Sequence, residues 1–394
     1  MNINPESFVA NTVKDLPFSG IRRFFDVAAK MKGAISLGVG EPDFETPWNV
    51  REAAIYHLEN HRTVYTSNSG TTELRTEISN YLSSRFEMEY NPETEVLVTV
   101  GGSEAIDLSL RTIINPGDEI IYVEPCFVPY RPCILLAGGI PVPIYAKAEN
   151  NFKLTAEELE AAITPKTKAL FINYPCNPTG AVMDKTDLEK ITAVLRNKNI
   201  LVISDEIYAE LTYSARHVSI STLPGMRERT IVHSGFSKAF AMTGWRLGYV
   251  CGPAEIVSQM TKIHQYTIMC VSTNAQYAGV EALRNSLHNV EQMVEAFNMR
   301  RRLMLDGFKR IGLPCFEPLG AFYLFPDITQ TGLNSEDFCV KLLNQEKLAV
   351  VPGTAFGING EGFIRCSYAY SNDELKAALE RLDRHINSDN TTHI

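Results

Sequence analysis

The stretch between residues 95 and 250 constrains the fold more than any other part of the chain. Short apolar runs rich in Val, Ile and Tyr alternate there with segments of helical periodicity. The apolar runs predict strands at residues 95–100, 118–125, 168–175, 199–206 and 229–236. Helical patterns cover residues 103–114, 155–163 and 185–198, and Thr155 and Asp184 are suitable N-caps for the last two. This alternation predicts an α/β fold with a mainly parallel sheet covered by helices.

At 394 residues the chain exceeds what one hydrophobic core usually holds, which predicts a large domain and a smaller one. The pattern changes past residue 280, where helical and strand-like runs follow at residues 290–310, 321–326, 335–345 and 362–369. We therefore expect a large domain at residues 46–287 and a smaller α+β domain at residues 288–394. Residues 1–45 are too few for a domain of their own and are expected to pack with the smaller one.

Charge and cysteine usage narrow the class of protein. The net charge is −9, from 37 basic and 46 acidic residues, which disfavours binding to nucleic acid or to an anionic membrane. The 8 cysteines are scattered without metal-ligand spacing, so no metal site is expected. The first residues lack the pattern of a secretory signal, and no apolar run is long enough to cross a bilayer. We expect a cytoplasmic protein.

Ligands of open α/β sheets bind beyond the carboxyl ends of the strands, so the residues that follow the predicted strands are the first candidates for a site. Gly102 and Ser103 follow the first strand and open a helix, where free backbone N–H groups would suit a phosphate. Phe127 and Asn177 follow the second and third strands. Taken singly, each of these residues also has an ordinary explanation as a turn or core residue.

The fourth predicted strand ends in two carboxylates, Asp205 and Glu206, with Tyr208 close behind. Carboxylates are rarely buried without a partner. At least one of the two should therefore meet a cation or an N–H group.

The fifth predicted strand leads into SGFSKAFAMTGWRLGY, at residues 234–249, which holds a single lysine, Lys238, and Arg246. A lysine with a lowered pKa attacks carbonyl carbons, and its Schiff base with pyridoxal phosphate is the best-known example. The planar guanidinium of arginine suits the phosphate of that cofactor. A lone lysine would be interpreted as a surface residue, but the residues around Lys238 favour a functional one.

Eight motifs along nearly the whole chain resemble those of class I/II aminotransferases, which are pyridoxal-phosphate enzymes of fold type I. In order, they are SLGVGEPDFETP, YTSNSGTTELR, GGSEAID, NPTG, SDEIY, SKAFAMTGWRLGY, GAFYLFP and IRCSYA. The resemblance implies that the large domain binds pyridoxal 5'-phosphate. It also implies that amino acids and 2-oxo acids are the substrates.

The resemblance assigns the cofactor-binding residues by position. Lys238 would be the Schiff-base lysine and Asp205 the partner of the pyridinium nitrogen. Asn177 and Tyr208 would bind the ring oxygen, and Phe127 would stack on the ring. The phosphate-binding segments would include Gly102, Ser103, the backbone N–H of Glu104, Ser234 or Ser237, and Arg246.

The same resemblance implies a homodimer with shared active sites. Tyr65 matches the tyrosine that reaches the cofactor phosphate of the neighbouring subunit. Arg365 matches the arginine that binds the substrate's α-carboxylate, with Asn177 and the backbone N–H of Gly40 beside it. The N-terminal SGIRRFF resembles a segment that closes over the site, with Ile21 and Phe24 as apolar contacts or as packing residues.

The predicted reaction is ping-pong transfer of an amino group between an L-amino acid and a 2-oxo acid. No second arginine for a dicarboxylate is evident between Lys238 and Arg300, which favours neutral, best aromatic, side chains. Aspartate, alanine or N-acetyl-diaminopimelate remain alternative donors, and a carbon–sulfur β-lyase remains an alternative reaction. A transcriptional sensor would carry an added DNA-binding module, and a dehydrogenase would need the third glycine that GVGEPD lacks.

Overall fold

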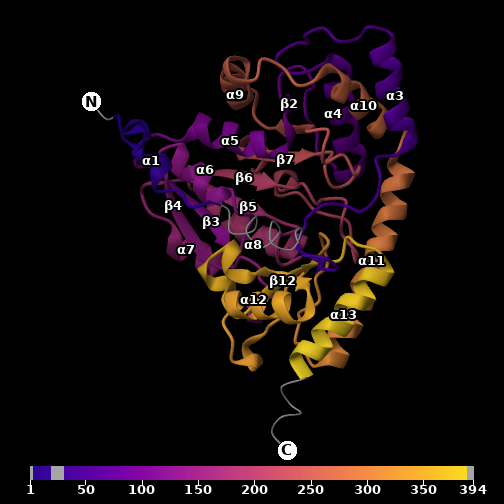
Figure 1. Ribbon diagram of the computed structural model, residues 1–394. Helices are drawn as coiled ribbons and strands as arrows, with labels where there is room; N and C mark the ends of the chain where they lie inside the picture. The colour runs from indigo at the N-terminus through magenta and orange to yellow at the C-terminus, as the bar shows by residue number, and fades with distance from the viewer. Residues whose placement is uncertain (1–2, 19–30, 388–394) are drawn as a thin grey trace, which may run out of the picture.

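A computed structural model describes residues 3–18 and 31–387, and a seven-stranded sheet forms its centre (Figure 1). The strand order is β2-β8-β7-β6-β5-β3-β4. In chain order these strands are β2 (Val96–Thr99), β3 (Glu119–Glu124), β4 (Ile140–Tyr145), β5 (Thr167–Asn173), β6 (Leu201–Asp205), β7 (Thr230–Gly235) and β8 (Gly248–Cys251). Strand β8 runs antiparallel to its two neighbours, and the other adjacent pairs are parallel. The predicted mainly parallel sheet is confirmed.

Two strands of this sheet were not predicted. Strand β4 contains Pro141 and Pro143, which lack the N–H that an interior strand needs. Its place at the edge of the sheet, with β3 as its neighbour, makes both prolines tolerable. Strand β8 is short and immediately follows the loop that carries Arg246, so its apolar run is hidden inside a longer motif.

Helices cover both faces of the large sheet. One face packs against α5 (Gly101–Ile113), α6 (Tyr130–Leu136) and α9 (Ala254–Thr267). The opposite face packs against α3 (Trp48–Glu59), α4 (Thr72–Phe86), α7 (Ala156–Ala162), α8 (Lys185–Leu195) and α10 (Thr273–Asn285). The strands are apolar on both sides as a result, which is why they read as continuous apolar runs. Thr155 and Asp184 are the N-caps of α7 and α8, as predicted, and each also forms a complete capping box.

The C-terminal part forms a second layer below the large sheet (Figure 1). Its strands form a three-stranded antiparallel sheet in the order β11 (Val351–Pro352), β12 (Ile364–Ser367) and β9 (Tyr323–Leu324). The helices are α11 (Leu287–Ile311), α12 (Ser335–Glu346) and α13 (Asn372–Asn387). Strand β1 (Ile35–Ser36) pairs in parallel with β10 (Leu348–Ala349), so part of the N-terminal segment joins this layer. The boundaries proposed at residues 45/46 and 287/288 stay a prediction.

The remaining elements are short. Helix α1 (Asn11–Lys14) lies near α6, and a 3-10 helix, η1 (Pro5–Phe8), precedes it. The other 3-10 helices are η2 (Ala148–Asn150), η3 (Ile220–Thr222), η4 (Arg227–Arg229), η5 (Thr329–Thr331), η6 (Gly353–Phe356) and η7 (Ile358–Gly360). Across the described ranges, every helix is too short or too polar to span a bilayer.

The loop of η6 and η7 joins the C-terminal layer to the large sheet. The backbone N–H of Cys126, just beyond β3, donates to the carbonyl of Phe356 at 2.9 Å. Asn359 Nδ2 donates to the carbonyl of Glu124 at 2.9 Å. Within the loop, Gly353 and Gly360 approach so closely that a Cβ on either would collide with the other's carbonyl oxygen.

Replacing Gly353 with alanine should therefore destabilise the protein. Both partners in the contact are backbone, so the added methyl group cannot be accommodated by a rotamer change, and we expect a loss of about 2 kcal/mol. Gly244→Ala is the matched control, because a Cβ there meets no atom within 4 Å. Chemical denaturation of both variants measures the effect, and equal midpoints for Gly353→Ala and wild type would contradict it.

Candidate active site

A cavity of about 310 Å³ opens at the carboxyl ends of the parallel strands. The strand ends, the start of α5 and the C-terminal layer all contribute to it. Its lining residues are Gly40, Gly102, Ser103, Ile106, Phe127, Tyr130, Asn173, Asn177, Asp205, Ile207, Tyr208, Ser237, Lys238, Thr243, Arg246, Tyr323 and Arg365. Most of the site residues named from the sequence thus meet in one place.

Lys238 follows β7, and its amine lies in the same cavity as the Asp205 carboxyl. The amine donates to the carbonyl oxygen of Gly40 at 2.5 Å. Burial is the main cause that lowers the pKa of the Lys238 amine to about 8; Glu41 opposes this shift, and Arg365 and Arg246 add to it. Part of this amine is therefore already neutral near physiological pH, as a nucleophile or a base requires.

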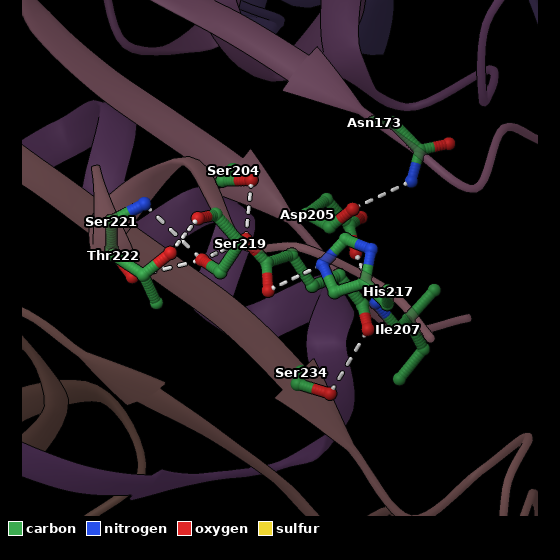
Figure 2. Close-up of polar contacts among 10 residues, drawn as sticks. Asn173, Ser204, Asp205, Ile207, His217, Ser219, Ser221, Thr222 and Ser234 are labelled. Carbon is green, nitrogen blue, oxygen red and sulfur yellow. Dashed lines mark hydrogen bonds and ion pairs between the residues drawn. The ribbon is translucent and has the colours of Figure 1, made fainter. Parts of the chain in front are cut away.

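Asp205 is the last residue of β6 and is 5% exposed. Its Oδ2 accepts the Tyr130 hydroxyl at 2.8 Å, and its Oδ1 accepts the backbone N–H of Ile207 at 3.1 Å. Asn173 donates to its backbone carbonyl at 2.9 Å (Figure 2). Burial raises the pKa of the Asp205 carboxyl to about 6, although the Tyr130 and Ile207 donors lower it. A positively charged group in the cavity would lower this pKa again and stabilise the ionised form.

Glu206, the second carboxylate of this pair, is satisfied away from the cavity. It is 1% exposed, and it accepts hydrogen bonds from the hydroxyl groups of Ser204 and Ser219 at 2.8 and 2.7 Å. His217 Nε2 lies 2.9 Å from its other oxygen (Figure 2). Both neighbouring carboxylates thus have the N–H or cationic partners that their burial requires.

The start of α5 and Arg246 form a cradle for an anion. The Arg246 guanidinium packs directly against Gly101, where a Cβ would lie 2.6 Å from its Nη2. Gly101 also has a φ of 73°, which favours glycine. On the other side, a Cβ at Gly248 would lie 2.6 Å from the carbonyl carbon of Gly101. Gly102 and Ser103 line the cavity at this point, where the positive end of the helix dipole attracts an anion.

Arg365 comes from β12 and is 3% exposed. Its Nη1 donates to Asn177 Oδ1 at 2.8 Å and its Nη2 to the carbonyl of Gly38 at 2.5 Å. The guanidinium lies between the rings of Tyr323 and Phe356, 4.4 and 4.6 Å from their centroids. Arginine has five N–H donors, so this rigidly held group keeps donors free for a ligand.

Three residues named from the sequence do not line the cavity. Glu104 turns its side chain to Val100 and His264, and the Ser234 hydroxyl donates to the carbonyl of Glu206 at 3.3 Å. Of the two serines named as alternatives, Ser237 is the one at the cavity. Tyr65 is 80% exposed on the surface of the chain. Ile21 and Phe24 lie outside the described residues.

Sequence reasoning missed Tyr130, Asn173 and Tyr323. Tyr323 pairs its hydroxyl with that of Tyr208 at 2.8 Å, and its phenol oxygen leaves no room for a Cβ at Gly40. Tyr323 was already inside the GAFYLFP motif, and Asn173 lies four residues before Asn177, so both had a signal. Tyr130 had none, because only the tertiary structure brings the start of α6 to the end of β6.

Comparisons with known proteins agree with this geometry. Residues 32–382 match the family described as "Aminotransferase class I and II". A putative aminotransferase of Bacillus subtilis is 53% identical over 96% of this chain and 98% of its own length. An aspartate aminotransferase of Pyrococcus abyssi is 45% identical over 93% of this chain and 95% of its own.

Solved structures give the same result. The aromatic aminotransferase of Pyrococcus horikoshii superimposes with a TM-score of 0.89 at 42% identity. The match covers 94% of this chain and 99% of that one. The chain therefore belongs to the class I and II aminotransferase family and is an aminotransferase.

Proposed function

We propose that the cavity binds pyridoxal 5'-phosphate through Lys238 and that the enzyme transfers amino groups from L-amino acids to 2-oxo acids in a ping-pong reaction. One observation carries the proposal: the Lys238 amine and the Asp205 carboxyl line the same cavity, beside the cradle of Gly101 and Arg246. An aldehyde, a basic ring nitrogen and a phosphate on one small molecule would match these three groups.

The residues of the cavity fit this cofactor. Arg246 and the first turn of α5 would hold the phosphate of the cofactor, and the Phe127 side chain would stack on the cofactor ring. Asn177 uses its Oδ1 on Arg365, and no acceptor in the described part of the chain is bonded to its Nδ2, which stays available for the ring oxygen. Tyr208 would bind the same oxygen. A protonated ring nitrogen opposite Asp205 would stabilise the carboxylate, whose pKa burial raises to about 6.

When bound, pyridoxal phosphate supplies an electron-poor ring that stabilises negative charge at the substrate's Cα. The protein's own contribution is to move the proton. Lys238 Nζ would take the proton from the substrate's Cα as a general base and deliver it as an acid to the cofactor carbon that carries the amino nitrogen, and a pKa of about 8 suits both steps. Ionised Asp205 would keep the ring nitrogen protonated throughout.

Arg365 would bind the substrate's α-carboxylate. Its contacts with Asn177 and with the Tyr323 and Phe356 rings fix the plane of the guanidinium before the substrate arrives. A bidentate pair would orient the substrate so that the Cα–H bond can be broken by Lys238. The backbone N–H of Gly40 would assist.

The charges of the cavity favour a neutral substrate side chain. Among the described lining residues, the cations are Lys238, Arg246 and Arg365, and each already has a role in this proposal. None is left for a second carboxylate, whereas Ile106, Ile207 and aromatic rings offer apolar contacts. The name of the Pyrococcus horikoshii structure supports aromatic donors, and that of the Pyrococcus abyssi relative supports aspartate.

Surface chemistry supports a homodimer with shared sites. Tyr65 and Val64 are 80% and 73% exposed, and Tyr266 is 86% exposed. The segment that contains Val64 and Tyr65 is bound to the region after α9, where Asn68 Nδ2 donates to the carbonyl of Met269 at 2.7 Å. If a second copy of the chain covers this apolar surface, Tyr65 of one copy would lie near the cofactor phosphate bound by the other copy.

Lys238→Ala should abolish covalent attachment of the cofactor while noncovalent binding persists. Borohydride reduction followed by mass spectrometry should label residue 238 in the wild type and nothing in the variant. Lys262→Ala, which removes a surface lysine on α9, is the matched control and should label like the wild type. A reducible adduct that survives in Lys238→Ala would overturn the proposed role.

Asp205→Asn should make the cofactor-free protein more stable at neutral pH. The folded pKa of about 6 exceeds the ordinary 3.8, so the folded state holds its proton more tightly. The protonated Asp205 carboxyl therefore stabilises the folded state fully below pH 4, and this stabilisation is lost as the pH rises to about 6. The variant's advantage should grow over that window by on the order of 3 kcal/mol. Thermal unfolding across pH 4–8 measures it, and a gap that does not change with pH would contradict it.

A panel of amino acids should rank aromatic donors first. Each donor is added without an oxo acid, and the absorbance of the bound cofactor reports the half-reaction. Phenylalanine and tyrosine should act at lower concentrations than aspartate or alanine. Faster conversion by aspartate would contradict the aromatic assignment, and release of ammonia and pyruvate from cystathionine would favour the β-lyase.

A further inference from the structure

A buried hydrogen-bonded pair adjoins the proposed phosphate site without lining the cavity. Glu104 lies in the first turn of α5, and its Oε1 is 2.7 Å from Nδ1 of His264. The His264 side chain is 0% exposed and that of Glu104 is 11% exposed. Because His264 belongs to the last turn of α9, the contact joins two helices on the same face of the sheet.

The second oxygen of Glu104 holds its side chain behind the cradle. Oε2 accepts the backbone N–H of Val100, the residue before α5, at 2.5 Å. Gly102 and Ser103 line the cavity, and within residues 3–18 and 31–387 no acceptor is bonded to their backbone N–H groups. The first-turn donors at the cavity therefore stay free for a ligand.

A carboxylate in the first turn of a helix is itself a good acceptor for that helix's free N–H groups. Released from its partners, Glu104 would compete with a phosphate for the donors of Gly102 and Ser103. Its negative charge would also repel the phosphate, and burial would strengthen the repulsion. The contacts with His264 and Val100 prevent the first effect and weaken the second.

We propose that His264 is a positioning residue for the cofactor phosphate. By its hydrogen bond with Glu104, it keeps that carboxylate away from the cradle. The inference rests on the proposed function, because it requires pyridoxal phosphate in the cavity.

The test compares pyridoxal 5'-phosphate with pyridoxal, which lacks only the phosphate. His264→Leu in the cofactor-free protein removes the donor and should weaken pyridoxal phosphate binding on the order of tenfold. Pyridoxal binding should stay as in the wild type. His264→Asn places an amide donor near the position of Nδ1 and should recover most of the affinity. Absorbance titration of the lysine-bound chromophore measures both ligands.

A second substitution separates charge from packing. Glu104→Gln keeps an acceptor for the Val100 N–H and removes the negative charge. Added to His264→Leu, it should restore pyridoxal phosphate binding to near the wild-type level. A packing defect caused by leucine would not be repaired in this way.

The outcomes are distinct. Equal losses for pyridoxal and its phosphate, or no recovery in the double variant, would overturn the role of His264. A wild-type protein that bonds neither ligand through Lys238 would instead overturn the proposed function. Should His264→Leu fail to fold, His264→Gln, which moves the donor away from the Nδ1 position, takes its place in the same comparison.

Discussion

Burial of an amine and a carboxyl group together at the carboxyl ends of the central strands is the constraint on which the rest of the site depends. Burial moves the two pKa values toward each other, that of Asp205 up to about 6 and that of Lys238 down to about 8. Both groups are thereby prepared for a ligand, since a positive ring atom would stabilise the charge of Asp205 and a carbonyl would react with Lys238. Burying these two ionisable groups destabilises the cofactor-free protein, as is common at active sites.

The sheet supports this arrangement because three adjacent parallel strands end close together. Asn173, Asp205 and His233 are register partners across β5, β6 and β7. The backbone N–H of Glu206 donates to the carbonyl of His233 at 2.8 Å, which fixes the chain just after Asp205. Glu206 in turn has polar partners of its own, since its carboxylate contacts His217 and Ser219 (Figure 2). A site on such strand ends is more precise than one on free loops.

Much of the fold was predictable because local patterns dictate it. The five strands and the helices α5, α7, α8, α11 and α12 follow from apolar periodicity and from caps such as Thr155. Strand β4 escaped prediction because its prolines contradict strand propensity unless the strand is known to lie at an edge. The β1 and β10 pair escaped because two-residue strands carry no period, and only packing unites segments more than 300 residues apart.

The sequence by itself determined the family motifs, the order of the strands along the chain and the chemical groups at the strand ends. Only the tertiary structure decided which of those groups meet. It brings Arg365 to Asn177 and the carbonyl of Gly40 to Lys238, selects Ser237 over Ser234 at the cavity, and turns Glu104 toward His264. The reason is physical: local periodicity fixes which face of an element is buried, whereas contacts between distant elements depend on how those faces pack together.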